Sequence, residues 1–138
     1  MKRVLVIDGQ GGRIGALVVK RIKELADVHI ICVGTNYAAT AAMLKAGAHE
    51  GATGENAAIV CSRNADYIVG PLGMVIADAL LGEITPKMAA AIGASSAKRL
   101  LIPPFDHCNN IVAGLPRRAT AELIELALAD IVREIDEA

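Results

Sequence analysis

Short apolar runs that alternate with helix-patterned segments constrain the fold of this chain most strongly. The runs occupy residues 4–7, 28–33, 67–69 and 99–102, with a weaker run at 111–113. Apolar residues recur at helical spacing within 13–25 and 120–135. Strands without polar alternation are buried on both faces, as in parallel sheets joined by helical crossovers. We therefore predict an α/β fold with a three-layer, doubly wound, mostly parallel sheet of about five strands, Rossmann-like or flavodoxin-like, in a single domain over 1–138.

Capping and breaking residues predict the remaining helices. Asn36 is placed to cap a helix over 37–46 that ends at Gly47, and Thr85-Pro86 opens a helix over 87–92. We also expect a helix over 72–81 and a short helix after a loop at 51–54. The carboxylates of Asp78 and Glu83 have local explanations, since Asp78 is expected to face water and Glu83 lies beside the predicted helix start.

The first apolar run leads directly into a glycine-rich loop. The segment Asp8-Gly9-Gln10-Gly11-Gly12-Arg13-Ile14-Gly15 lies between this strand and the following helix, which is the context that a phosphate-binding loop requires. Gly9 permits a tight turn, and Gly11 and Gly12 let backbone N–H groups approach an anion. Gly15 lets the helix pack closely. The loop predicts a bound phosphate or nucleotide, although the same glycines also suit a plain strand-to-helix turn.

The polar residues after the other strands are predicted to face the same ligand. Ligands of open parallel sheets bind beyond the carboxyl ends of the strands, and here those ends carry Gly9, Gly34, Gly70 and Pro103. Thr35 and Asn36 follow the second strand and can offer donors to a ligand. A plain helix cap explains Asn36 equally well.

The glycine loop resembles the nucleotide loop of extended and atypical short-chain dehydrogenases and reductases, with the pattern Gly-x-x-Gly-Arg-Ile-Gly at residues 9–15. The resemblance covers residues 1–35 and implies a dinucleotide. An NAD-binding fold carries Asp or Glu about 20 residues after the loop, whereas the second strand here ends in Gly34-Thr35-Asn36. Arg13 can instead meet a 2′-phosphate, so NADP is favoured over NAD if either binds. A solvated arginine at a helix start explains Arg13 equally well.

Two signatures of nucleotide enzymes are missing from the sequence. The Tyr-x-x-x-Lys pair of the short-chain reductases does not occur around Tyr37 or Tyr67, and no Gly-Lys-Ser/Thr follows the glycine loop. The loop therefore predicts binding without identifying a reaction.

Six further segments carry a resemblance over nearly the whole chain to a family of small bacterial proteins known as a domain of unknown function. They are Asp8–Gly12, Val33–Asn36, Met43–Gly47, Gly51–Asn56, Leu81–Pro86 and Cys108–Asn110. That family implies no established activity, so no catalytic role is carried over from it.

The segment 106–110 has the densest run of reactive side chains. It follows the fourth predicted strand, so it is expected to face the same edge of the sheet. His107 and Cys108 are candidates for a general base and a nucleophile, but neighbours on an extended chain point to opposite sides. We favour polar ligand contacts from Asn109 and Asn110. No metal site is predicted.

Composition narrows the choice of partners. The net charge is -1 and aromatic residues make up 2% of the chain, so neither a nucleic-acid-binding surface nor base stacking is indicated. Three separated cysteines and no apolar run of membrane length lead us to expect a cytoplasmic protein. The mean hydropathy of +0.45 favours a homo-oligomer that uses residues 72–81 and 88–94 as contact surfaces.

Three hypotheses remain open from the sequence. The first is a small nucleotide- or phosphometabolite-binding domain of unidentified cofactor. The second is an NADP-dependent oxidoreductase-like enzyme with proton transfer by His107 or Cys108. The third is a protein-interaction domain without a small ligand.

Overall fold

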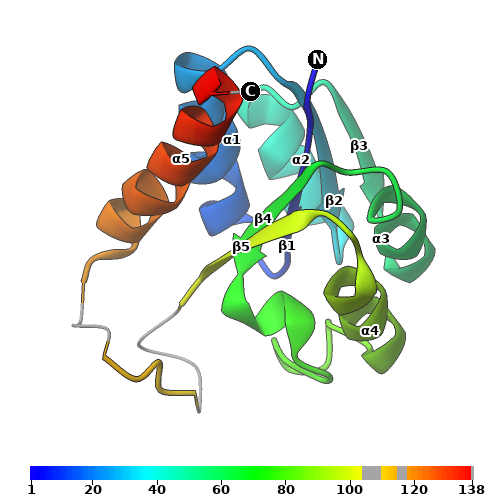
Figure 1. Cartoon of the computed structure of the whole chain (residues 1–138). Helices are drawn as coiled ribbons and strands as arrows, with labels where there is room; N and C mark the ends of the chain where they lie inside the picture. The colour runs from blue at the N-terminus through cyan, green and yellow to red at the C-terminus, as the bar shows by residue number, and fades with distance from the viewer. Residues whose placement is uncertain (104–109, 115–117, 138) are drawn as a thin grey trace.

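Five parallel strands form one sheet with helices on both faces (Figure 1). The computed structural model describes residues 1–103, 110–114 and 118–137. The strands are β1 (Arg3–Asp8), β2 (His29–Gly34), β3 (Glu50–Thr53), β4 (Tyr67–Pro71) and β5 (Lys98–Ile102). The helices are α1 (Arg13–Leu25), α2 (Tyr37–Ala46), α3 (Glu55–Cys61), α4 (Pro86–Ala94) and α5 (Thr120–Glu137), with a 3₁₀ turn η1 at Leu72–Val75.

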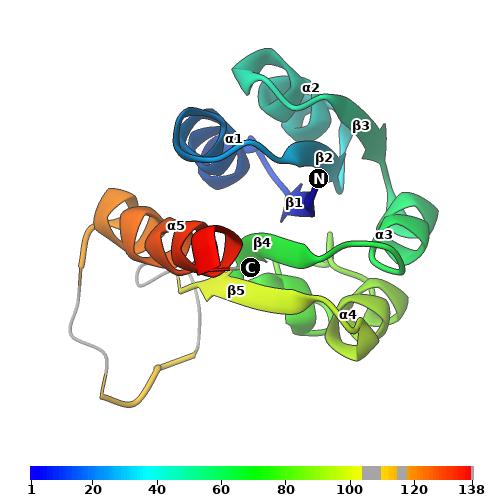
Figure 2. The same ribbon diagram turned by 45° about the horizontal axis from the view of Figure 1, so that its top comes forward.

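The strand order β3-β2-β1-β4-β5 confirms the predicted doubly wound α/β class. The chain builds outward from β1 to β3 and then crosses to β4 on the other side of β1. The order therefore reverses between β1 and β4, and in doubly wound sheets the crevice at such a reversal is where ligands bind. Figure 2 shows α1, α2 and α5 on one face of the sheet and α3 and α4 on the other.

Alternate residues of the central strands β1, β2 and β4 pack into two hydrophobic cores, one on each face of the sheet. On β1, Val4 and Val6 face the core under α1 and α5, whereas Leu5 and Ile7 face the core under α3 and α4. All four are at most 1% exposed. Burying apolar area on both faces of each central strand explains why these strands read as continuous apolar runs.

The predicted caps and helix bounds are largely confirmed. Asn36 Oδ1 accepts a hydrogen bond from Ala39 N at 2.9 Å, and Thr85 Oγ1 accepts one from Met88 N at 3.2 Å. Pro86 opens α4, where its missing N–H is not needed. On α5, the predicted apolar face is buried at Ile124, Leu128 and Ile131.

The expected loop at 51–54 is wrong, because residues 50–53 form the edge strand β3. It pairs only with β2, and Gly51 lies so close to β2 that an added Cβ would stand 2.9 Å from Cys32 Sγ. The four residues of β3 are small or polar and all but Ala52 are exposed, so they form no apolar run and periodicity does not reveal this strand. The weak strand expected at 111–113 is also wrong, since these residues are exposed and outside the sheet.

The helix expected over 72–81 is replaced by η1 and a compact turn over 76–84. Asp78 N donates to Ile84 O at 2.7 Å, and Ile84 N donates to Ala79 O at 3.1 Å, so the chain folds back on itself. Met74 and Ile84 are both fully buried by this closure. A continuous helix would not return Ile84 to the same core as Met74.

Candidate functional site

The glycine loop lies at the carboxyl end of β1, beside the point where the strand order reverses. Gly12 N donates to Gly9 O at 2.9 Å to close the turn. Gly12 takes φ 71° as the residue before α1, and an added Cβ there would lie 2.8 Å from Ala39 Cα. Left-handed backbone and contact with α2 both require glycine at this position. A bulky residue at Gly12 would therefore disturb the fold as well as any ligand.

The Asp8 carboxylate fills the inner side of the loop. Its Oδ1 accepts from Gly9 N at 2.8 Å and its Oδ2 from Gly15 N at 2.7 Å, and the side chain is buried. Burial raises the pKa of Asp8, the backbone donors oppose that shift, and the nearby Glu83 carboxylate adds to it. Asp8 thus occupies part of the α1 N-terminus that an external anion would otherwise use.

The outer side of the loop is open. Gln10, Gly11 and Arg13 are exposed, and a Cβ added at Gly11 would meet nothing within 4 Å. Ile14 is half-buried, and Gly9, Gly12 and Gly15 are buried. An incoming group can therefore reach the backbone at Gly11 and Arg13, whereas the buried glycines shape the turn.

Glu83 reaches this loop from the turn at 76–84. Its Oε1 accepts hydrogen bonds from Thr35 Oγ1 at 2.5 Å, Asn36 Nδ2 at 2.8 Å and Gln10 N at 3.0 Å. Asn36 Nδ2 also donates to Gln10 O at 2.9 Å. The donors of the glycine loop and of the end of β2 therefore converge on one carboxylate oxygen.

The ionisation of Glu83 follows from these contacts. Burial on its own raises the pKa of the carboxyl, but the hydrogen bonds from Thr35, Gln10 and Asn36 together outweigh burial and lower it. Glu83 is therefore charged at neutral pH and stands beside Asp8.

The structure brings together some of the predicted residues and not others. Thr35, Asn36 and the loop share one site, and Asn36 combines the predicted cap with a contact to Glu83. Gly70 is buried in β4, where an added Cβ would lie 2.4 Å from Ile7 O, so it allows close strand packing and offers no surface. Asn110 is exposed. His107, Cys108 and Asn109 lie outside the described residues.

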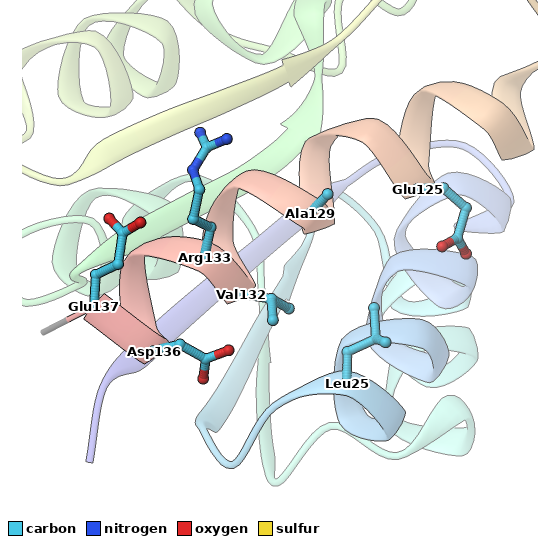
Figure 3. Close-up of a pocket in the computed structure, with 7 residues that line it drawn as sticks. All are labelled: Leu25, Glu125, Ala129, Val132, Arg133, Asp136 and Glu137. Carbon is cyan, nitrogen blue, oxygen red and sulfur yellow. The ribbon is translucent and has the colours of Figure 1, made fainter.

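A hollow of about 520 Å³ lies away from the glycine loop (Figure 3). It is lined by Leu25 at the end of α1 and by six residues of α5. The α5 residues are Glu125, Ala129, Val132, Arg133, Asp136 and Glu137. Small apolar side chains are mixed there with charges of both signs. The hollow shares no residue with the glycine loop.

Within residues 1–103, 110–114 and 118–137, no three His, Cys, Asp or Glu side chains group closely enough to hold a metal ion. No helix in that part of the chain is long and apolar enough to cross a membrane.

Comparison with known proteins identifies the family. The sequence model of the protein family described as Domain of unknown function (DUF3842) matches residues 3–136 of this chain. The chain belongs to the DUF3842 family. No curated protein matches this DUF3842 chain. A solved structure similar to it is a dodecameric FMN-dependent UbiX-like decarboxylase from Escherichia coli O157:H7, with 17% identity, a TM-score of 0.46, and coverage of 95% of this chain and 76% of that one.

Sequence reasoning missed the role of Glu83 in the DUF3842 chain. Thr35 and Glu83 are 48 positions apart, and the neighbouring α4 start offered a sufficient local explanation for the acid. The available signal was the segment Leu81–Pro86, which carried part of the family resemblance but had no structural role assigned. A rule that looks for an acid shortly after β2 cannot find one that arrives from a later turn.

Proposed function

We propose that this chain is a small nucleotide- or phosphometabolite-binding domain whose ligand lies over the outer face of the 9–15 loop. The observation that supports this most is the convergence of Gln10 N, Thr35 Oγ1 and Asn36 Nδ2 on a single oxygen at the carboxyl edge of the sheet. These donors come from two segments, the glycine loop and the end of β2, and together they form a preorganised polar site around that oxygen. The reversal of strand order beside it is where doubly wound sheets bind their ligands.

The phosphate position is the part of the loop that Asp8 leaves open. Asp8 takes the amides of Gly9 and Gly15, so a ligand phosphate is assigned to the amides of Gly11 and Arg13 at the start of α1. The exposed Arg13 side chain supplies a positive charge next to them. This arrangement gives a ligand phosphate a cationic neighbour at the start of α1.

Ligand binding is tested by thermal shift with ADP, GDP, NAD, NADP, FMN and sugar phosphates at millimolar concentration. A ligand present at 100 times its Kd adds about 2.7 kcal/mol to the free energy of unfolding, which gives a readily measured rise in Tm. We expect at least one phosphorylated ligand to raise Tm. If every ligand leaves Tm unchanged, the proposal is wrong.

Gly11→Ala is the variant that separates binding from folding. The added methyl group meets open space in the protein but stands where a ligand phosphate would approach the backbone. Gly93→Ala is its matched control, because Gly93 on α4 also has open space around an added Cβ. Loss of the ligand-induced shift in Gly11→Ala alone supports the site, whereas an unchanged shift in both variants places the ligand elsewhere.

A homo-oligomer remains part of the proposal, although its predicted contact surfaces change. Met88, Ala89 and Ile92 are buried against the sheet, and no helix forms over 72–81. Exposed apolar side chains instead occur on the neighbouring helices α1 and α5, where Leu17 is 49% and Leu126 is 53% exposed. Sedimentation equilibrium at micromolar concentration tests this part of the proposal, and a monomeric mass would rule out the homo-oligomer.

The enzyme hypothesis gains no support from the described residues, since its proton-transfer candidates His107 and Cys108 lie outside them. Binding is therefore proposed without a reaction.

A further inference from the structure

An acidic side chain lies beside the end of β2, although none follows β2 in the sequence. Dinucleotide folds place an Asp or Glu at the end of the second strand, where the carboxylate binds the ribose hydroxyls. Here Thr35 and Asn36 occupy that place in the sequence, and both donate hydrogen bonds to Glu83. A carboxylate therefore stands beside the end of β2 and next to the glycine loop, although it comes from the turn before α4.

The two oxygens of Glu83 have different surroundings. Oε1 accepts hydrogen bonds from Thr35, Asn36 and Gln10. None of the residues that the structure describes donates to Oε2, and the side chain is only half-buried. One oxygen thus fixes the orientation of the carboxylate, and the other can accept a hydrogen bond from a ligand hydroxyl.

The turn at 76–84 holds Glu83 in this orientation. Asp78, Leu80 and Leu81 have φ values of 65°, 57° and 56°, in the left-handed region that L-residues disfavour. The buried Ile84 anchors the turn immediately after Glu83. Backbone conformations of this kind persist where surrounding contacts fix them, and they gather at ligand sites.

We propose that Glu83 selects nucleotides whose ribose has a free 2′-hydroxyl, with that hydroxyl donating to Oε2. This inference rests on the proposed function, because it assigns the sugar of the same ligand whose phosphate lies on the 9–15 loop. A 2′-phosphate would bring a second negative charge against the carboxylate and is disfavoured. The dinucleotide preference therefore reverses from the NADP suggested by Arg13 to NAD.

Calorimetric titration of the wild-type chain with matched nucleotides tests the inference. The probes are NAD against NADP, and ADP and GDP against their 2′-deoxy counterparts. We expect NAD to bind about tenfold or more tightly than NADP, because the 2′-phosphate of NADP would bring like charges together at Glu83. We also expect each deoxynucleotide to bind more weakly than its ribonucleotide, since Oε2 loses its donor.

Two variants then assign the discrimination to Glu83. Glu83→Gln removes the charge and should bring the affinities for NAD and NADP to within about threefold of each other, because the repulsion is gone. Glu55→Gln is the charge-matched control: Glu55 begins α3 at the same edge of the sheet but takes no part in the Glu83 hydrogen bonds. It should keep the wild-type ratio.

Each outcome decides between the two proposals. If sugar phosphates bind but none of the nucleotides does, the inference is overturned and a phosphometabolite site stands. If nucleotides bind with no preference at the 2′ position, Glu83 is not a ribose contact and the proposed function stands. If Glu83→Gln binds every probe more tightly, the Glu83 carboxylate competes with the ligand for the site instead of contacting its ribose, and the inference is overturned. Should Glu83→Gln fail to fold, the wild-type ribose and deoxyribose affinities decide alone.

Discussion

Asp8 Oδ2 accepts a hydrogen bond from the amide of Gly15 at 2.7 Å, so the last residue of β1 caps the helix that follows it. The contact is short because Gly15 has no Cβ: one added there would lie 2.9 Å from Asp8 Cβ and 2.5 Å from Met43 Sδ. The glycine loop is thus assembled around a carboxylate of the chain itself. Its inner face is structural, and only its outer face is available to a ligand.

The pH dependence of stability should show that burial dominates the ionisation of Asp8. Burial raises the folded-state pKa above the ordinary 3.8, so the native state holds this proton more tightly than the unfolded chain. The contribution of Asp8 is therefore complete below about pH 3.8 and is lost as pH rises through its folded-state pKa. The Tm advantage of the wild-type chain over Asp8→Asn should shrink as pH rises, as measured by calorimetric scans from pH 3 upward. An advantage that grows with pH would mean that the hydrogen bonds outweigh burial.

The stability contribution of Glu83 should depend on pH in the opposite direction. Its folded-state pKa lies below the ordinary 4.5, so its contribution is present above that value and is lost as pH falls through the folded-state pKa. The Tm advantage of the wild-type chain over Glu83→Gln should therefore decline on acidification. Equal curves at every pH would contradict the hydrogen bonds from Thr35 and Asn36.

Gly11 and Gly12 should differ sharply in their tolerance of a side chain. Gly12→Ala is expected to lose about 1–3 kcal/mol of stability, because it combines a left-handed backbone with a contact to Ala39. Gly11→Ala should change stability by less than about 0.5 kcal/mol. Urea unfolding of both variants measures the difference, and equal losses would place the turn in another conformation.

Asn36 variants can separate the helix cap from the contact with Glu83. Asn36→Asp keeps an acceptor for Ala39 N but replaces the Nδ2 donor with a negative charge facing Glu83. Asn36→Ala loses the cap as well, which costs about 1 kcal/mol at a helix start. We expect Asn36→Asp to raise the pKa of Glu83, as measured by carboxyl NMR titration. A Glu83 pKa that stays at its wild-type value would contradict the contact.

The sequence predicted what depends on local pattern. The apolar runs of β1, β2, β4 and β5, the caps at Asn36 and Thr85, and the buried face of α5 follow from spacing and capping chemistry. The features that failed depend on distant contacts. β3 forms because β2 offers it a free edge, and the turn at 76–84 forms because Ile84 is buried with Met74.

The candidate site divides in the same way. The position of the glycine loop followed from its place between a strand and a helix. The division of its amides between Asp8 and the outer face did not, because that depends on where two carboxylates fold. Glu83 joins Thr35 across a separation that no local pattern spans.

Binding at the outer face of the glycine loop is tested most directly by amide NMR during titration with ADP. The proposal predicts that the largest shifts occur at Gln10, Gly11 and Arg13, with smaller shifts at Thr35 and Asn36. Shifts confined to Ala129, Val132 and their neighbours would place the ligand in the hollow beside α5. Unchanged spectra at millimolar ADP, GDP, NAD and sugar phosphate would contradict a phosphate-binding site on this loop.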